Sequence, residues 1–447
     1  MRFTLLLLAP WFLLRATPVI TAGNPLIDPA QFRVTTFASG LSFPTSLALL
    51  PDRSFLVGTT IQSNPALPSG YFAFGAGSGQ LLRLTDTNAD GVADGPGTVV
   101  ANLTGAVTSV RTIGDIVVVT TTGNGVDASS KDLSIVFLRQ GANPTDTYTS
   151  LGQLGLNFAD PSVPSSSIAL ALRPASGQPG SFDVFFTLAA GDHLGNQIGT
   201  VTLSGLLSGS VYPGSVTRFT ATPALASVTL SPAAQVASGV RTSAGIAFDS
   251  NGNLLLTDNG FEGIADELHI LTAGALGGST FLGYPNNYPE YITNNFIGGA
   301  GQQAFTAFQP LGGHESRGIA EISLAPTTFP SALNSGYFVG FHGIWEEVGT
   351  ANTANPVYFV DRATGAFFPL LESAQSGLSK PDGLLGVDEG LFVLDLFTQR
   401  DFVPGTGAVY LITFAPSLSE VPEPATVALL AAGLFAAALA GRYCGRS

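Results

Sequence analysis

The side chains able to carry acid–base chemistry are few in this chain of 447 residues, which contains four histidines. His193, His314 and His342 each lie where an apolar segment begins or ends, next to Gly, Asp or Glu residues. Histidine titrates near neutral pH and can act as a general base, whereas an arginine such as Arg241 binds anionic groups. For any one histidine, a polar loop residue bonded to backbone is the alternative. His269 lies inside an expected strand and is interpreted as structural.

A second group of chemically capable residues is the acidic segment that begins at Asp86. Asp86, Asn88 and Asp90 alternate, a glycine takes the sixth position and Asp94 takes the ninth, which matches the start of a calcium-binding loop. The bidentate acid expected at the twelfth position is replaced by Gly97. The segment therefore predicts a Ca²⁺ site with Asp86, Asn88, Asp90 and Asp94 as ligands. A hairpin loop held by Asx turns, without an ion, is the alternative.

A repeated pattern indicates the elements that must position these residues. Each repeat has a small or polar lead-in, an alternating apolar strand, a turn and a second apolar strand, beginning at residues 43, 107, 167, 243, 318 and 381. A third strand follows each hairpin, beginning at residues 79, 132, 214, 266, 355 and 407. The pattern predicts an all-β fold, a six-bladed β-propeller over residues 31–414. A β-sandwich or a parallel β-helix is the alternative.

The strand that begins at Gln31 is left over from the six repeats, and we expect it to pair into the last blade and close the ring. In such a ring the loops that enter the innermost strands and those that leave the second strands share one end, here called the mouth. The sequence places there Arg241, His314, Glu315, Arg317, Lys380, Asp382, Asp192, His193, Asp258, Asn259, His342 and Asp395. This set predicts a ligand-binding mouth.

Both ends of the chain resemble targeting segments. Residues 1–22 have an early arginine, an apolar run from Phe3 to Leu14 and small residues ending at Ala22, which predicts a secretory signal peptide cleaved near Ala22. A buried N-terminal helix is the alternative. Residues 415–447 contain a linker, a short motif, an uncharged apolar run over residues 425–440 that predicts a transmembrane helix, and a basic tip.

Pro422, Glu423 and Pro424 precede that apolar run. The segment resembles the PEP-CTERM sorting tail, whose signature is Pro-Glu-Pro before an apolar span and a basic end. The resemblance covers the last 27 residues or so and implies an exosortase-type protease as partner. It further implies export across the bacterial inner membrane, a transient membrane anchor before the tail is removed, and display at the surface of a bacterium that makes extracellular polysaccharide.

Composition narrows the function classes. Lys and Arg number 17 against 31 Asp and Glu, so the net charge is −14 and binding of nucleic acid is disfavoured. The single cysteine, Cys444, allows no internal disulfide in the predicted ring. The sequence has no nucleophile elbow, phosphate-binding loop or dinucleotide fingerprint.

The repeats also resemble the glucose/sorbosone dehydrogenases, propellers that use pyrroloquinoline quinone (PQQ). The segments that carry the resemblance are 191–197 (GDHLGNQ), 240–248 (VRTSAGIAF), 258–260 (DNG), 266–268 (DEL), 314–319 (HESRGI) and 341–345 (FHGIW). An active enzyme of this family would need His193, His314 or His342 to act as base from a different blade, with Arg241 on the cofactor, so these four are the candidate catalytic residues. The resemblance implies cofactor binding by Arg241, Asp258, Asn259 and Gly260.

The departures from that family concern the catalytic base. Where the family has a histidine before the third innermost strand, this chain has serines at 165–167, which lack a pKa near neutrality. Thr242 replaces an expected asparagine. Glu346 or Glu347 replaces an expected basic residue, a sign change that would repel a tricarboxylate cofactor. The active site is therefore interpreted as degenerate.

Three hypotheses remain open at this stage. The first is an exported, surface-sorted propeller that binds a ligand, such as a sugar or extracellular polysaccharide, without turnover. The second is an active PQQ-dependent sugar or aldose dehydrogenase. The third is a structural protein of the extracellular matrix.

Overall fold

In the computed structural model of the chain, the described residues are 18–61, 78–123, 133–158, 168–190, 200–260, 264–285, 301–310, 317–341, 343, 356–372, 380–396 and 404–415. Strands form nearly all of the regular structure there. Two 3-10 helices, η1 (Pro29–Gln31) and η2 (Ala273–Gly277), complete it. The described part of the chain is therefore an all-β protein, as predicted.

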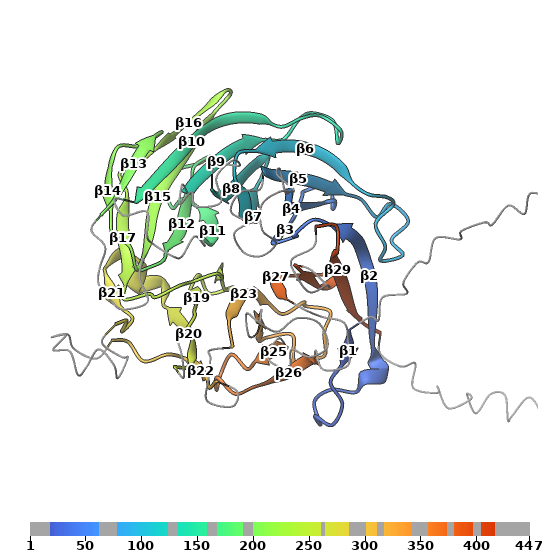
Figure 1. Ribbon diagram of the computed structural model, residues 1–447. Coiled ribbons are helices and arrows are strands. Elements are labelled where there is room, and N and C mark those ends of the chain that lie inside the picture. The colour runs from blue at the N-terminus through green and yellow to red at the C-terminus, as the bar shows by residue number, and fades with distance from the viewer. Residues whose placement is uncertain are drawn as a thin grey trace, which may run out of the picture.

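The strands form six sheets arranged around a common centre (Figure 1). The innermost strands are β3 (Ser46–Leu49), β7 (Ala106–Ile113), β11 (Leu170–Pro174), β18 (Ile246–Phe248), β23 (Ile319–Leu324) and β27 (Pro381–Val387). Each contacts the next in chain order, and β27 contacts β3, so the six make a closed cycle. The six-bladed β-propeller predicted from the repeats is confirmed.

Two further strands in every sheet were also expected from the sequence. The second strands are β4 (Phe55–Ile61), β8 (Ile116–Thr122), β12 (Phe182–Leu188), β19 (Leu254–Asp258), β24 (Tyr337–Phe341) and β28 (Gly390–Asp395). The third strands are β5 (Ser78–Leu84), β9 (Leu133–Arg139), β15 (Ser215–Ala224), β20 (Asp266–Leu271), β25 (Val357–Val360) and β29 (Gly407–Phe414). All pair antiparallel within their sheets, and each lies where the repeat pattern predicted it.

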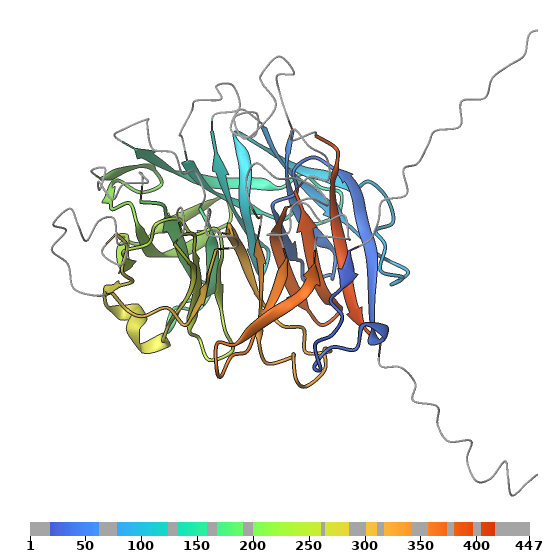
Figure 2. The same ribbon diagram turned by 60° about the horizontal axis from the view of Figure 1, so that its bottom comes forward.

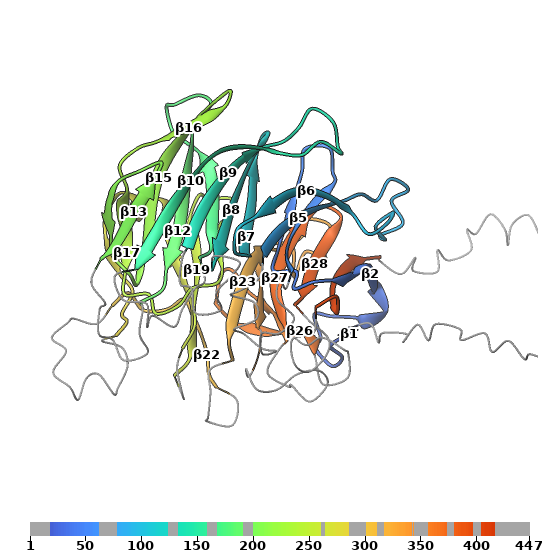
Figure 3. The same cartoon turned by 45° about the horizontal axis from the view of Figure 1, so that its top comes forward.

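The outer strands complete the blades. Those next to the third strands are β6 (Thr98–Leu103), β10 (Thr149–Phe158), β17 (Ala234–Ser238), β22 (Thr306–Phe308), β26 (Phe367–Glu372) and β2 (Phe32–Leu41). Shorter strands extend some sheets: β1 (Val19–Ile20), β13 (Val201–Gly205), β14 (Gly209–Val211), β16 (Ser227–Leu230) and β21 (Thr280–Phe281). Figure 3 shows the large second sheet, with β7, β8, β9 and β10 side by side.

The ring is closed by pairing between the first and last parts of the body. β2 lies antiparallel to β29, with Phe32 opposite Phe414 and Leu41 opposite Gly407. Figure 2 shows this blue strand beside the red one at the edge of the ring. The prediction that the strand beginning at Gln31 pairs into the last blade is confirmed.

The core consists of apolar clusters between neighbouring sheets, one for each of the six contacts around the ring. At the closing contact, Phe37 of β2 lies between Phe55 of the first sheet and Phe392 of the sixth. Its ring centroid is 5.3 Å from that of Phe55 and 5.1 Å from that of Phe392. Phe37 is 1% exposed, so burial of this ring contributes about 1.5–3 kcal/mol to closure.

Candidate functional site

The register of the strands defines the mouth of the ring. In the sixth sheet the start of β27 lies opposite the end of β28, with Pro381 paired to Asp395, and the other sheets repeat this antiparallel arrangement. The loops that enter innermost strands therefore meet those that leave second strands. Of the predicted mouth residues, the structure describes Arg241, Asp258, Asn259, Arg317, Lys380, Asp382 and Asp395, and also Gly260.

Arg241 enters β18 and is anchored by the segment that leaves β19. Its Nη1 donates to the Asn259 backbone oxygen at 3.0 Å, to Asn259 Oδ1 at 3.2 Å and to the Gly260 backbone oxygen at 2.8 Å. The residue is 7% exposed. These contacts hold a buried guanidinium through neutral oxygens, and a cation positioned in this way at the end of the ring is suited to an anionic ligand.

Asp258, the last residue of β19, fixes the backbone of this loop. Its two carboxylate oxygens each accept a hydrogen bond from the Arg241 backbone N–H at 3.0 Å, and Oδ1 accepts from the Thr242 N–H at 2.8 Å. Burial raises the pKa of Asp258 to about 7, while the backbone hydrogen bonds and the charge of His269 act in the opposite direction. The predicted residues Arg241, Asp258, Asn259 and Gly260 thus form one connected cluster.

The same device recurs in the sixth sheet. Asp395 ends β28, and its Oδ1 accepts the backbone N–H of Lys380 at 2.8 Å, just before β27 begins. Lys380 is 1% exposed and Asp395 is fully buried. In both sheets an aspartate at the end of the second strand binds the backbone of a basic residue at the entry to the first. The repeat therefore places one buried cation at the mouth in each of these two sheets, through the same hydrogen bond from backbone to aspartate.

The other sequence-predicted residues have different positions. His193, His314, His342, Asp192 and Glu315 lie outside the described residues. Arg317 donates from Nε to the Gln309 backbone oxygen at 2.6 Å, and its guanidinium bonds the Tyr358 hydroxyl and lies over that ring, 5.5 Å from its centroid. Arg317 thus packs against the fifth sheet. His269 is buried on β20, with Nε2 3.0 Å from Glu267 Oε2.

The predicted calcium loop follows β5, at the opposite end of the ring from the mouth, because Leu84 pairs with Phe55 while Ser78 pairs with Ile61. Asp86 accepts from the N–H groups of Asp90 and Gly91, and Asp94 accepts from that of Thr87. These contacts fit the Asx-turn alternative. Within the described residues no group of three or more His, Cys, Asp or Glu side chains is placed to hold a metal ion. Calcium binding here stays a prediction.

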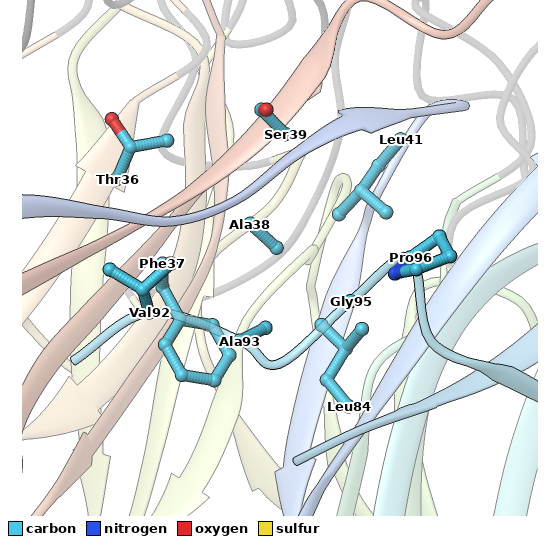
Figure 4. Close-up of a pocket in the computed structure, with 10 residues that line it drawn as sticks. All are labelled: Thr36, Phe37, Ala38, Ser39, Leu41, Leu84, Val92, Ala93, Gly95 and Pro96. Atoms are coloured by element: carbon cyan, nitrogen blue, oxygen red, sulfur yellow. The ribbon is translucent and has the colours of Figure 1, made fainter. Parts of the chain in front are cut away.

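A cavity of about 330 Å³ opens beside this loop. Figure 4 shows that its lining comes from β2, from the end of β5 and from the loop after β5. Phe37, Ala38, Leu41 and Ala93 give it an apolar floor, and its described lining residues include no charged side chain. The Ala93 N–H also donates to the Phe37 carbonyl at 2.8 Å, so the loop binds the strand that closes the ring. The lining is thus separate from the described residues of the mouth.

An ion pair near the centre of the ring was not predicted from the sequence. Arg111 of β7 donates from Nη2 to Glu321 Oε2 at 2.6 Å, joining the second and fifth sheets across the ring. Glu321 is 4% exposed, and Arg111 also donates to Ser46 Oγ of the first sheet at 3.2 Å. The available signal was a single charged residue inside each of two apolar innermost strands.

Comparisons with known proteins concern the tail and the fold separately. Residues 420–446 match the family model described as the PEP-CTERM protein-sorting motif. The chain ends in a PEP-CTERM sorting motif. This motif is typical of exported proteins that are sorted at the membrane. Pro422, Glu423 and Pro424, and the predicted apolar span, lie outside the described residues. In the described ranges no helix is long and apolar enough to cross a membrane.

Several of the solved structures similar to the propeller are named as sugar dehydrogenases. A glucose dehydrogenase is 14% identical, with a TM-score of 0.53, covering 85% of this chain and 99% of its own. A protein from Thermus thermophilus described as a putative oxidoreductase (glucose dehydrogenase) is 17% identical, with a TM-score of 0.50 and the same coverage. The PQQ-bound aldose sugar dehydrogenase of Streptomyces coelicolor is 13% identical, with a TM-score of 0.49, covering 86% and 100%. No curated protein matches the chain. At 14% and 17% identity, the likeness to the first two structures shows the fold alone.

Proposed function

We propose that the protein is exported, sorted to the cell surface and binds a ligand, in the first place a carbohydrate, at the mouth of the propeller without chemical turnover. The proposal rests on the hydrogen bonds and the pKa of Asp258. Asp258 is a described mouth residue whose pKa burial raises to about 7, in the range that a general base requires. Its oxygens accept hydrogen bonds from the backbone N–H groups of Arg241 and Thr242, so it serves the loop rather than a substrate.

The cofactor implied by the resemblance of the repeats to glucose/sorbosone dehydrogenases is PQQ. PQQ is a tricarboxylate that accepts two electrons and a proton from a sugar when bound. Arg241, a buried cation held by carbonyl oxygens, fits one carboxylate of such a group, and Lys380 supplies a second buried cation at the same end. These residues would bind and orient an anionic ligand, which among carbohydrates is an acidic sugar or an acidic polysaccharide. They do not supply a base, because both are cations and Asp258 is occupied.

An active PQQ-dependent sugar dehydrogenase is the second candidate, favoured by the shared fold. It requires His193, His314 or His342 to act as base from another blade, in place of the serines at 165–167. A structural matrix protein is the third candidate and is supported by the sorting tail alone.

The test is a ligand titration of the purified exported protein in which the melting temperature is measured at each ligand concentration. Binding without turnover predicts a saturable rise with a sugar or an extracellular polysaccharide and no dye reduction with PQQ and calcium present. Dye reduction with aldoses would replace the proposal by the dehydrogenase. A rise with calcium alone would support the Asp86 loop as an ion site. The absence of any response would favour the structural protein.

Two arginine variants make the titration specific. Arg241→Ala removes the buried cation of the mouth and should abolish the ligand-induced rise. Arg53→Ala is the matched control, because Arg53 lies in the turn after β3, at the other end of the ring, and pairs with Glu389. Equal loss of the response in both variants would show that ligand binding does not occur at the mouth.

A further inference from the structure

The carboxylate of Asp258 is buried directly behind the loop that holds Arg241. Asp258 is 5% exposed, and its oxygens accept hydrogen bonds from the backbone N–H groups of Arg241 and Thr242 at 2.8–3.0 Å. Backbone N–H groups are dipoles and carry no net charge, so these bonds orient the carboxylate without neutralising it. A buried carboxylate held in this way is costly to ionise.

Two further titratable side chains lie on the same face of the fourth sheet. Asp258 of β19 is paired with Glu267 of β20, and Leu256 is paired with His269. Because residues two positions apart in a strand share a face, Asp258, Glu267 and His269 lie on one face. His269 is fully buried, and its Nε2 lies 3.0 Å from Glu267 Oε2. The charges nearest to Asp258 on this face therefore come from β20.

The third sheet packs against that face mainly through apolar side chains, among them Phe185, Val216 and Val240. Its charged residues on the facing side are Arg173, Asp183 and Arg218. Arg173 and Asp183 form an ion pair at 3.2 Å near the end of the ring opposite the mouth, and Arg218 lies over the Phe185 ring, 5.9 Å from its centroid. The third sheet thus places its described charges away from the mouth, where Asp258 lies.

The cation of the mouth is bonded to the residues that directly follow Asp258. The Arg241 guanidinium donates to the carbonyl oxygens of Asn259 and Gly260, at 3.0 and 2.8 Å. Asp266, on the other face of β20, accepts the Gly260 N–H at 2.7 Å. An anion bound to Arg241 would therefore lie beside the segment that carries the Asp258 carboxylate. Two like charges placed in this way repel each other, and protonation of the carboxylate removes the repulsion.

We propose that the mouth binds an acidic glycan together with a proton, which Asp258 takes up from solvent. The carboxylate becomes a neutral carboxylic acid, and no covalent bond to the ligand forms. Ligand and proton would then favour each other's binding to the same extent, as linkage requires. This inference rests on the proposed function, because it needs an anionic ligand at Arg241.

The direction and size of the coupling follow from electrostatics. Burial raises the pKa of Asp258 to about 7, and a bound anion raises it further. Affinity should therefore be high where Asp258 is protonated and fall as pH rises through 7. At an effective dielectric constant of about 20, two like charges about 12 Å apart shift a pKa by about one unit. A shift of that size makes binding about tenfold weaker at about pH 9 than at about pH 6.

The test is calorimetric titration of the purified exported protein with trigalacturonate, an acidic trisaccharide that stays ionised over this pH range. The titration is run at about pH 7.5 in Tris and in imidazole, two buffers that differ in ionisation enthalpy. A pKa shift of about one unit predicts uptake of about half a proton per ligand at that pH. The uncharged trisaccharide maltotriose is the control and should bind, if it binds, without proton uptake.

The outcomes separate this inference from the proposed function. Binding of trigalacturonate without proton uptake, or with an affinity independent of pH, would overturn the inference and leave the proposed function standing. Equal proton uptake with maltotriose would overturn repulsion between like charges as its cause. If neither trisaccharide bound, the proposed function would fail and the inference with it.

Two aspartate variants assign the proton. Asp258→Asn keeps an oxygen that can accept a backbone N–H but cannot titrate, so it should abolish proton uptake and make the affinity independent of pH. Asp183→Asn is the matched control, because Asp183 is also a buried aspartate, 6% exposed, near the opposite end of the ring. It should leave proton uptake unchanged. Uptake that persists in Asp258→Asn would overturn the assignment, and the proton count of the wild type decides the coupling even where a variant does not fold.

Discussion

The ion pair between Arg111 and Glu321 gives the sharpest stability prediction. Replacing Arg111 with methionine keeps most of the side-chain length but leaves the Glu321 carboxylate, 4% exposed, without its cation. Breaking a buried pair by removing one partner costs about 3–5 kcal/mol, because an uncompensated charge remains in the interior. We expect Arg111→Met to lower the free energy of unfolding by about this amount near pH 8.

The loss should depend on pH in a defined direction. Burial raises the pKa of Glu321, and the charge of Arg111 acts against this rise. A carboxyl with a pKa raised by folding contributes its full stability below the unfolded value, and the contribution is lost as pH rises through the folded value. Without Arg111 the folded pKa rises further. The gap between wild type and Arg111→Met should therefore be large at about pH 8 and smaller at about pH 5.

The assay is urea unfolding at these two pH values, with the double variant Arg111→Met/Glu321→Leu as control. Because the double variant has no buried charge left at this pair, it should regain most of the stability lost in the single variant. A single variant that loses under about 1 kcal/mol at pH 8 would refute the reasoning. A double variant no more stable than the single one would refute it equally.

Three further predictions concern the mouth, the closing contact and the packing of innermost strands. Burial raises the pKa of Asp258 to about 7, so the free energy of unfolding of the wild type should fall as pH rises through 7. The variant Asp258→Asn should lack this fall. If urea unfolding gave the two proteins the same dependence of unfolding free energy on pH, the prediction would be contradicted. Phe37→Ala should lower the free energy of unfolding by about 3–5 kcal/mol, because it leaves a cavity between the sixth and first sheets. A loss below about 1 kcal/mol would contradict this prediction. Gly245→Ala should cost about 1–3 kcal/mol in the same assay, because the new Cβ would lie 2.5 Å from the Ala320 carbonyl oxygen; unchanged stability would refute this.

The hairpins could be predicted because their second strands are buried on both faces of a blade, so they read as short continuous apolar runs bounded by turn residues, as β8, β12 and β28 show. The third strands follow each hairpin at a regular place in the repeat. The outer strands other than β2 could not be predicted. β10 and β17 mix exposed and buried residues along one edge, so their alternation is weak, and β22 has three residues. β1 was hidden by its position inside a segment with the composition of a leader. In each case a nonlocal neighbour, rather than the local pattern, decides the strand.

The candidate site was predictable in part for the same reason. The repeat fixes where loops enter and leave a blade, and it therefore places Arg241, Asp258 and Asn259 at one end of the ring. The hydrogen bond from the Lys380 backbone to Asp395 shows the same rule in another sheet. The pairing of Arg111 with Glu321 could not be predicted, because it joins residues 210 positions apart across the ring.

The pairing of Phe32 with Phe414 has a consequence for the order of events during export. The sixth blade is built from residues near both ends of the body. Its outer strand, β2, can therefore pair with β29 only after almost the whole chain has been made and moved across the membrane. Closing a loop of that length carries an entropic cost that local hairpin formation does not. The sorting motif begins at residue 420, a few residues after β29 ends at Phe414. The strand that completes the ring is thus joined to the sorting motif by residues 415–419 alone.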